Sequence, residues 1–225
     1  MEELLEIKLY FAYTSPFTYL AMEPAYALEQ SHRVRLRFMP FAVKIRRVYG
    51  DLPERSDTAW RKVRYLYRDA RRFANERGLI IRGPKRIYNA RLAAIGGLYA
   101  DRCGRFRPYS DRVFERFFKR ELDVEDPAAL EAIIAEVGLD PEDFRRYAAH
   151  EGPADLASSI AESDRDQIFG VPTFVVEGEL FWGNDRIDWV IKKLDKMGLR
   201  RRAPKAASSS QERPQLTIKG PENDA

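Results

Sequence analysis

The chain has 225 residues, and its 44% hydrophobic and 12% aromatic content is ample for one large domain or two small ones. A single cysteine, Cys103, excludes an intramolecular disulfide and a multi-cysteine zinc cluster, and two histidines leave little for metal chemistry. No apolar run approaches the ~20 residues of a transmembrane helix, and the N-terminus has no basic-then-apolar leader. We therefore expect a cytoplasmic protein with no metal site and no membrane segment.

The net charge of +4 is unevenly distributed along the chain. Residues 31–92 contain 18 Lys and Arg against 5 Asp and Glu, a difference of +13. A nucleic-acid surface has this kind of charge, but here the charges are interleaved with a regular apolar stripe. We therefore interpret them as a solvated helix face and a rim that attracts anionic small molecules, and we expect no nucleic-acid partner.

The first elements are a strand, a helix and a second strand. Residues 7–12 predict the first strand, and Ser15-Pro16 predicts the start of the helix, because Ser is a favoured N-cap and Pro is tolerated at the first helical position. Residues 34–38 alternate between apolar and polar and predict a strand that Pro40 ends. A right-handed crossover would make the two strands parallel.

The next hundred or so residues are expected to be helical. Apolar residues spaced by three and four predict a long amphipathic helix over about residues 57–77, which Gly78 ends. Further helices are expected at 89–100, at 109–120, from Asp126 to Gly138, from Asp140 onward and at about 153–167. The Gly96-Gly97 pair indicates that the first of these lies close to a neighbouring helix.

Strands return near the C-terminal end. Residues 173–177, a turn at Gly178 and residues 180–182 predict a hairpin, and Asn184 and Asp185 are candidate caps of a final helix. Beyond Leu199 the composition turns to Arg, Ala, Ser, Pro and Gln, which predicts a disordered tail at 200–225. The pattern predicts an α/β protein in which residues 1–43 and 168–199 form one discontinuous domain, split by a helical insertion of residues 44–167.

Two stretches far apart in the sequence are candidates for a binding or reactive site. The helix that starts after Ser15 presents unpaired N–H groups and a partial positive charge, which stabilise an anion such as a thiolate. In Val171-Pro172-Thr173, a proline precedes a β-branched strand, although proline cannot donate to a sheet. It fits best at the first residue of the strand, with Val171-Pro172 as a candidate cis peptide.

These two stretches together resemble the thioredoxin superfamily, in which the active-site helix and a cis-proline face each other. The resemblance implies a thioredoxin-like fold split by a large all-helical insertion. Redox members of the superfamily carry Cys-x-x-Cys where this chain has Ser15-Pro16-Phe17-Thr18, so both thiols are absent here.

The resemblance narrows when the flanking residues are included. Residues 11–21, FAYTSPFTYLA, resemble the opening of 2-hydroxychromene-2-carboxylate isomerases and of the related kappa-class glutathione transferases, both in the DsbA-like branch. Residues 169–173, FGVPT, followed by 180–186, LFWGNDR, resemble the closing motif of the isomerases. The resemblance covers about the first two hundred residues. It implies a glutathione-dependent isomerase of aromatic catabolism, acting on an unsaturated aromatic-derived ketoacid through a bound glutathione thiolate.

The glutathione contacts implied by the resemblance each have a structural alternative. Ser15 is implied to be the catalytic residue that holds the glutathione thiolate, and its alternative role is an N-cap worth about 1 kcal/mol. The backbone of Val171 is implied to pair with the cysteinyl part of glutathione, or else it only starts a strand. Trp182, Gly183, Asn184 and Asp185 are implied glutathione contacts, and in the alternative Asn184 or Asp185 only caps the last helix.

Two residues are implied to contact the substrate. Lys44 lies in a Val-Lys-Ile segment similar to that of the family and would pair with a substrate carboxylate, or is one more surface lysine. Tyr88 would hydrogen-bond a substrate oxygen, or packs on the insertion. The family has an Asn-Arg pair ahead of the long helix, and residues 53–57, PERSD, offer no clear counterpart, so the exact substrate stays open.

Two other functions stay open on the sequence. A kappa-like transferase would conjugate glutathione to an electrophile and release a stable thioether. A thioredoxin-like binding or chaperone module that lost its redox pair would bind no glutathione specifically. In either enzymatic case the partner is a small, anionic molecule, and the sequence leaves a homodimer open.

Overall fold

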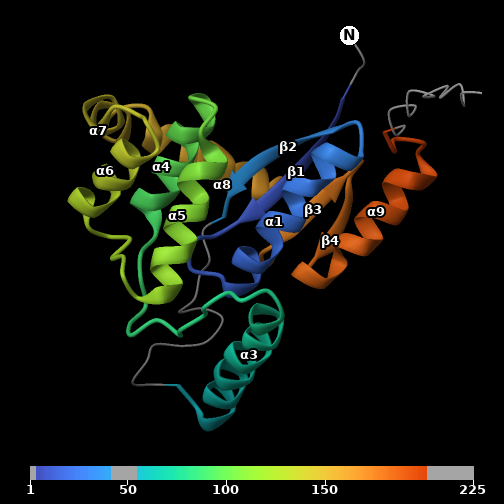
Figure 1. Ribbon diagram of the computed structural model, residues 1–225, viewed down its shortest axis with the longest axis horizontal. Coiled ribbons are helices and arrows are strands. Elements are labelled where there is room, and N and C mark those ends of the chain that lie inside the picture. The colour runs from blue at the N-terminus through green and yellow to red at the C-terminus, as the bar shows by residue number, and fades with distance from the viewer. Residues whose placement is uncertain (1–3, 42–54, 202–225) are drawn as a thin grey trace, which may run out of the picture.

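The computed structural model describes residues 4–41 and 55–201 of the chain (Figure 1). At its centre is a mixed four-stranded sheet with the strand order β2-β1-β3-β4. Lys44 lies outside the described residues, as do residues 202–225 of the tail predicted at 200–225, whereas Arg200 and Arg201 are ordered against the end of the first helix. The α/β class and the thioredoxin-like sheet predicted from the sequence are confirmed.

The N-terminal strand–helix–strand unit forms as predicted. Strand β1 (Leu5–Phe11) pairs in parallel with β2 (Val34–Pro40), and the register runs from Leu5 opposite Val34 to Phe11 opposite Pro40. The crossover between them is helix α1 (Pro16–Ser31), whose first residue is the predicted proline. Because α1 follows directly on the end of β1, its N-terminus lies at the edge of the sheet where β1 ends (Figure 1).

The C-terminal hairpin brings two distant motifs together. Strand β3 (Thr173–Val176) runs antiparallel to β1, and β4 (Glu179–Trp182) runs antiparallel to β3. The two turn residues, Glu177 and Gly178, both have positive φ angles, of 50° and 77°, which suits the tight turn of a twisted hairpin. Thr173 therefore lies opposite Trp182, so that β3 begins where β4 ends.

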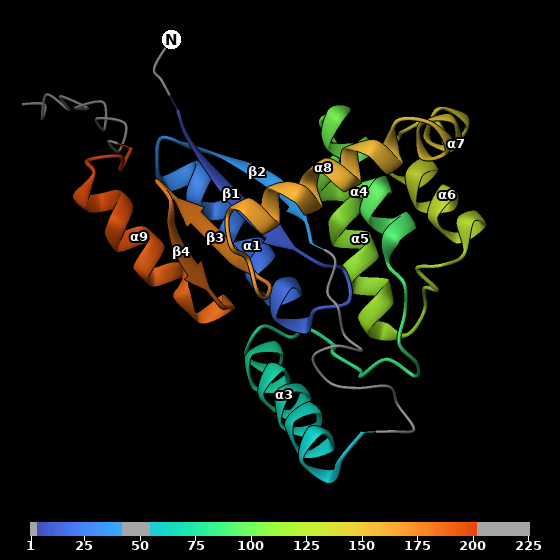
Figure 2. The same cartoon turned by 180° about the vertical axis from the view of Figure 1, so that it is seen from behind.

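Helices occupy the described chain between β2 and β3. They are α3 (Asp57–Glu76), α4 (Arg91–Arg102), α5 (Phe106–Lys119), α6 (Pro127–Glu136), α7 (Pro141–Ala149) and α8 (Gly152–Arg165). Helices α4 to α7 gather at one side of the sheet, α8 returns along the sheet, and α3 stands apart beyond the edge where α1 begins (Figures 1 and 2). The helical insertion predicted from the sequence is therefore present as a layer beside the sheet.

The helical layer is joined to the sheet unit through Tyr13, which follows β1. Its hydroxyl forms a 2.8 Å hydrogen bond with Ser110 Oγ of α5, and its ring packs edge-on against Phe11. A Cβ atom added to Gly97 of α4 would lie 2.6 Å from the Tyr13 hydroxyl. A Cβ atom on Gly96 would in turn meet the Tyr109 hydroxyl of α5, so the Gly96-Gly97 pair marks close packing against a neighbouring helix, as expected. The site that begins two residues after Tyr13 thus stands on a rigid base.

Helix α8 packs on the face of the sheet opposite to α1 (Figures 1 and 2). Lys8 of β1 contacts both Glu162 and Asp166 at 2.7 Å, and the Tyr10 hydroxyl donates to Asp166 over the same distance. A small apolar cluster lies beside this network and includes Tyr10 and Val175. The last residues of the helical segment are therefore held on the sheet, immediately before the loop that leads into β3.

The final helix, α9 (Ile187–Lys196), follows a short 3-10 turn, η2 (Asn184–Arg186). The chain after α9 is fastened to the end of α1: Arg33 N–H donates to Leu199 O at 2.8 Å, and Arg201 N–H donates to Ser31 O at 2.9 Å. Within residues 4–41 and 55–201, every helix is too short or too polar to cross a bilayer.

Candidate functional site

Ser15 caps helix α1 and faces the loop before β3. Its backbone is extended, with φ of −93° and ψ of 116°, and its Oγ accepts a 3.2 Å hydrogen bond from the Thr18 N–H. The same hydroxyl donates to Val171 O over 3.4 Å, a long and weak contact. Ser15 and Val171, which lie 156 positions apart in the sequence, are therefore close enough to contact the same small ligand atom.

The loop that carries Val171 is fixed by bonds on both sides. The Val171-Pro172 peptide is cis, as predicted. Thr173 Oγ1 donates to Gly170 O at 2.7 Å, and Gly183 N–H donates to Pro172 O at 2.9 Å. These bonds tie the loop to its own strand and to the end of β4, while Val171 itself stays partly exposed. Its backbone is thus held in place beside the start of α1.

Trp182 lies over this loop with half of its side chain open to solvent. Its indole Nε1 lies so close to Gly170 that an added Cβ atom would be 2.7 Å away, so any larger residue there would displace the ring. The Phe169 ring packs edge-on against Trp182 with 4.9 Å between centroids. The exposed fractions are 66% for Phe169 and 53% for Trp182, which leaves two large aromatic rings without cover beside Val171. Exposed aromatic surface of this kind is typical of a binding site.

The structure gives the last helix no side-chain cap, so the expectation that Asn184 or Asp185 caps it is wrong. The chain enters α9 through η2, whose own backbone bond from Arg186 N–H to Gly183 O occupies the position that a cap would serve. Asp185 instead pairs with Arg186 at 2.8 Å. Gly183 has a φ of 121°, which other residues rarely adopt.

Asn184 is the most buried polar residue of this turn, with 9% of its surface exposed. Its side chain forms no hydrogen bond with another described residue, yet its amide atoms are not among the fully buried polar atoms left without a partner. The Asn184 amide is therefore accessible to a polar ligand at the end of β4.

The electrostatics at Ser15 favour an anion and provide no base. The N-terminus of α1 carries a partial positive charge and its first turn contains no acidic residue. Ser15 Oγ bonds with backbone atoms only, so within the described residues it has no His, Asp or Glu partner of the kind that activates a serine nucleophile. The site is therefore built to hold a negative charge rather than to make Ser15 attack.

Of the residues implied to contact the substrate, Tyr88 is described and Lys44 is not. Tyr88 is half-buried against the Phe117 ring, 5.3 Å away between centroids, and Arg86 lies over its face at 4.1 Å. These contacts hold it on the helical layer, as in its alternative packing role. No described hydrogen bond joins Tyr88 to Ser15 or Val171, so its role toward a substrate stays a prediction.

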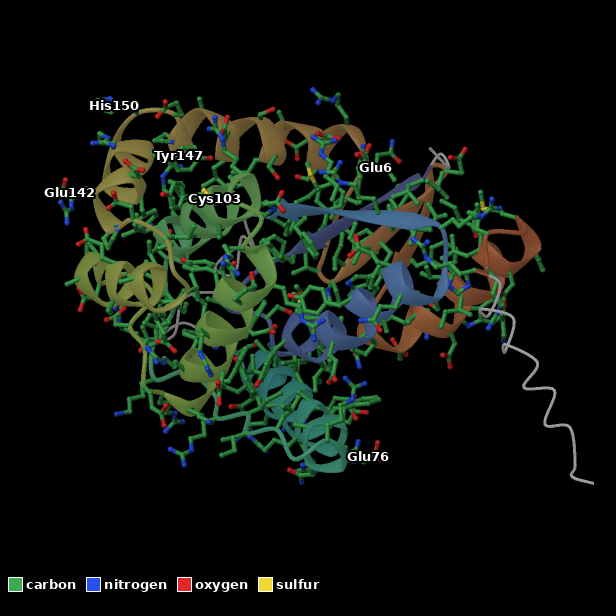
Figure 3. All side chains as sticks on the ribbon, turned by 45° about the horizontal axis from the view of Figure 1, so that its top comes forward. Glu6, Glu76, Cys103, Glu142, Tyr147 and His150 are labelled. Atoms are coloured by element: carbon green, nitrogen blue, oxygen red, sulfur yellow. The ribbon has the colours of Figure 1, made fainter. Side chains whose placement is uncertain are left out.

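Cys103 is the exposed residue that ends α4 (Figure 3). Over residues 4–41 and 55–201, the acidic residues, histidines and cysteine form no group of three that could hold a metal ion.

Sequence reasoning missed one feature of the site, the state of Thr18. Its side chain is completely buried, and its hydroxyl has no hydrogen-bond partner among the described residues. The only sequence signal is its place, because Thr18 stands where redox members carry their second cysteine. No local pattern shows that its hydroxyl is unsatisfied.

The strand order, the α1 N-terminus and the facing Val171-Pro172 loop define a protein of the thioredoxin class. Residues 6–195 match the family described as the DSBA-like thioredoxin domain, and the chain belongs to this family. The family and fold resemblance drawn from the sequence is thereby confirmed.

The sequence of the chain is similar to those of 2-hydroxychromene-2-carboxylate isomerases. The chain is 26% identical to the enzyme of Pseudomonas putida over 184 residues, which covers 80% of this chain and 90% of that protein. It is 23% identical to the enzyme of Sphingobium xenophagum over 188 residues, or 82% of this chain and 95% of the other.

Solved structures agree on the fold. A 2-hydroxychromene-2-carboxylate isomerase superposes with a TM-score of 0.71 at 23% identity, covering 86% of this chain and 96% of that one. The cytosolic disulfide reductase DsbM of Pseudomonas aeruginosa, determined with GSH, superposes with a TM-score of 0.60 at 16% identity, covering 85% and 100%.

Proposed function

We propose that this chain is a glutathione-dependent isomerase that acts on an unsaturated, anionic ketoacid derived from an aromatic compound. The observation that carries the proposal is the position of Ser15 Oγ, at the N-terminus of α1 and 3.4 Å from Val171 O. A thiol bound between these two groups would meet a hydroxyl donor and the positive end of a helix. The named relatives, which match four-fifths of the chain, support an isomerase.

The residues present fit glutathione at each end. The partly exposed backbone of Val171 offers an N–H and a carbonyl to the peptide of the cysteinyl residue. At the end of β4, the unpartnered Asn184 amide and the exposed Asp185 carboxylate suit an α-amino group, and Trp182 offers an aromatic wall. A protein of the same fold has been solved with GSH, so the fold is compatible with this ligand.

Ser15 has a defined task in this proposal. When bound, glutathione supplies a thiolate that adds reversibly to an unsaturated carbon, so that the neighbouring bond rotates before the thiolate leaves. Ser15 turns its O–H from the weak contact with Val171 O toward the sulfur and keeps the thiol ionised. Depressing a thiol pKa by ~2 units needs roughly 2.7 kcal/mol. One charge-assisted hydrogen bond of about 1.5–3 kcal/mol and a helix terminus can provide this together.

The experiment that tests the proposal is product analysis. The purified protein is incubated with glutathione and 2-hydroxychromene-2-carboxylate, and the products are separated and weighed by mass spectrometry. The proposal predicts a rearranged product of unchanged mass, formed only with glutathione, which is not consumed. A stable thioether would identify a transferase, and calorimetry that shows no specific glutathione binding would identify a non-catalytic module.

A further inference from the structure

The Thr18 hydroxyl is buried, unsatisfied and adjacent to the proposed thiolate site. Thr18 is fully buried in the first turn of α1, and its Oγ1 makes no hydrogen bond with any described group. A threonine in a helix can bond back to a carbonyl of the preceding turn, but Thr18 does not. Leaving a buried hydroxyl without a partner is destabilising, so the free protein has here a donor that would gain from a new hydrogen bond.

The helix geometry places this hydroxyl beside Ser15. With Ser15 as N-cap, Thr18 is the third helical residue, and in a capping box the side chains at these two positions each reach the backbone N–H of the other residue. The two hydroxyls are not hydrogen-bonded to each other in the free protein. The same spacing separates the two cysteines of a Cys-x-x-Cys disulfide, whose Cβ atoms must come within about 4.5 Å. The Thr18 N–H already donates to Ser15 Oγ at 3.2 Å, which confirms that the two residues are neighbours.

Ser15 Oγ has room for one more donor. A hydroxyl oxygen accepts two hydrogen bonds and donates one. At present Ser15 accepts one bond, from the Thr18 N–H, and donates the long one to Val171 O. Its second acceptor position is therefore free within the part of the structure described.

We propose that Thr18 is a positioning residue, which donates its hydroxyl to Ser15 Oγ when Ser15 turns its own O–H toward a bound glutathione thiolate. The proton of each hydroxyl stays on its oxygen, and no covalent bond is made or broken in this chain of donors. Hydrogen bonds in series polarise one another, so the Ser15 hydroxyl becomes a stronger donor to the sulfur. The inference rests on the proposed function, because it needs a thiolate at Ser15.

The test compares Thr18→Val with Thr18→Ser. Valine keeps the shape and removes the hydroxyl, whereas serine keeps the hydroxyl. For each protein, the ultraviolet absorbance of bound glutathione thiolate is titrated against pH, and the melting temperature is measured. Thr18→Val is expected to raise the pKa of the bound thiol by about half to one unit, a several-fold loss of thiolate. It is also expected to raise the melting temperature, because an unsatisfied hydroxyl is removed. Thr18→Ser should keep the wild-type titration.

Thr173→Val is the matched control. Thr173 is a buried threonine of the same site, but its hydroxyl is satisfied by Gly170 O at 2.7 Å. Its removal should lower the melting temperature, the opposite sign from Thr18→Val. Should Thr18→Val fail to fold, Thr18→Ala provides the same titration, with the same upward shift expected.

The outcomes separate this inference from the function on which it rests. A wild-type thiolate signal that Ser15→Ala weakens and Thr18→Val leaves unchanged would overturn the role of Thr18 alone. A lower melting temperature in Thr18→Val with an unchanged titration would make Thr18 a structural residue and would also overturn it. No thiolate signal in the wild type would overturn the proposed function and the inference with it.

Discussion

Ser15 Oγ makes two hydrogen bonds of unequal strength. The bond from the Thr18 N–H caps α1, and the contact with Val171 O, at 3.4 Å, is close to the limit of a hydrogen bond. Turning the hydroxyl toward a ligand would therefore give up little and would leave the cap in place. The two roles weighed for Ser15 are compatible, and they are separated by what each predicts for a mutation.

Replacement of Ser15 by alanine should have a small effect on stability and a large effect on turnover. The lost cap is expected to lower the free energy of unfolding by about 1 kcal/mol. The lost donor to the thiolate should lower the rate near neutral pH by roughly ten- to a hundredfold. Thermal denaturation and initial rates against pH measure the two effects. A rate that falls no more than the folded fraction would leave Ser15 as a cap.

Replacement of Ser15 by cysteine changes the chemistry at the same point. A thiol would then stand in place of the Ser15 hydroxyl, and with oxidised glutathione (GSSG) it should form a mixed disulfide by thiol–disulfide exchange, releasing one reduced glutathione, at the expense of isomerisation. Mass spectrometry of the intact protein should find a glutathione adduct that a reductant releases. An enzyme with a cysteine at this position that isomerises at the wild-type rate and forms no adduct would place the sulfur elsewhere.

Gly170 sets the position of the Trp182 indole. Since an added Cβ would lie 2.7 Å from Trp182 Nε1, Gly170→Ala should displace the ring and weaken glutathione binding several-fold while the protein stays folded. Gly83→Ala is a matched control, because its Cβ would meet Tyr67 only at an ordinary 3.8 Å. Calorimetric titration with glutathione measures both, and equal affinities for the two variants would exclude Trp182 from the binding site.

At the scale of single elements, α9 is fastened to α1 through Asp195. Its carboxylate accepts from buried His32 at 3.1 Å and pairs with Arg200 at 2.8 Å. The hydrogen bond from Arg200, helped by His32, holds the pKa of Asp195 at about 2, below its usual 3.8. A carboxyl group with a depressed pKa in the folded state stabilises the fold above its unfolded pKa and stops doing so as the pH falls through the folded one.

The stability that Asp195 provides should therefore be lost between about pH 4 and pH 2. Wild type is expected to melt at a higher temperature than Asp195→Asn at pH 6, and the difference should shrink across this window. Asp188→Asn is the control on the same helix, since the Asp188 carboxylate makes no ion pair with a described residue. A constant difference from pH 6 to pH 2 would show that the Asp195 contacts do not act through its charge.

Helix α3, which lies beyond the edge of the sheet where α1 begins (Figures 1 and 2), presents a row of arginines. Arg61, Arg64, Arg68 and Arg71 follow one another at spacings of three, four and three, so they share one face of the helix, and all four are exposed. Within the described residues they have no acidic partner, whereas Arg72 pairs with Asp69. The C-terminal end of α3 is fixed to α1, because Arg77 donates to Leu20 O at 2.5 Å.

This arginine row should speed the arrival of anionic substrates. The double replacement Arg64→Gln and Arg71→Gln is expected to lower kcat/KM a few-fold at low salt and to leave kcat unchanged. The difference should vanish near ~0.5 M salt, where charges are screened within a few ångströms. Lys192→Gln with Lys196→Gln on α9 removes the same charge elsewhere and is the control. Equal losses in the two double variants would mean that net charge alone acts.

At the scale of the whole molecule, the sequence predicts the elements well because their signals are local. Ser15-Pro16, Asp126-Pro127 and Asp140-Pro141 each start a helix through a cap and a proline, and all three caps form. The Glu177-Gly178 turn is likewise local. The helix bounds differ by a few residues, as for α5, which begins at Phe106 rather than at 109.

What the sequence does not predict depends on the exact path of the folded backbone. The cap expected from Asn184 fails because the η2 turn intervenes before α9, and its backbone hydrogen bond serves the position of a cap. The unsatisfied Thr18 hydroxyl is invisible for the same reason. The division into residues 1–43 with 168–199 and an insertion of 44–167 stays a prediction, and α8, on the insertion side, also packs on the sheet through Glu162.

The measurement that tests the account most directly is a crystal structure of the protein soaked with glutathione. The account predicts the sulfur within hydrogen-bond distance of Ser15 Oγ, the cysteinyl peptide paired with the backbone of Val171, and the γ-glutamyl end beside Asn184 and Asp185. Glutathione bound elsewhere on the surface, or no glutathione at a concentration that supports turnover, would contradict it.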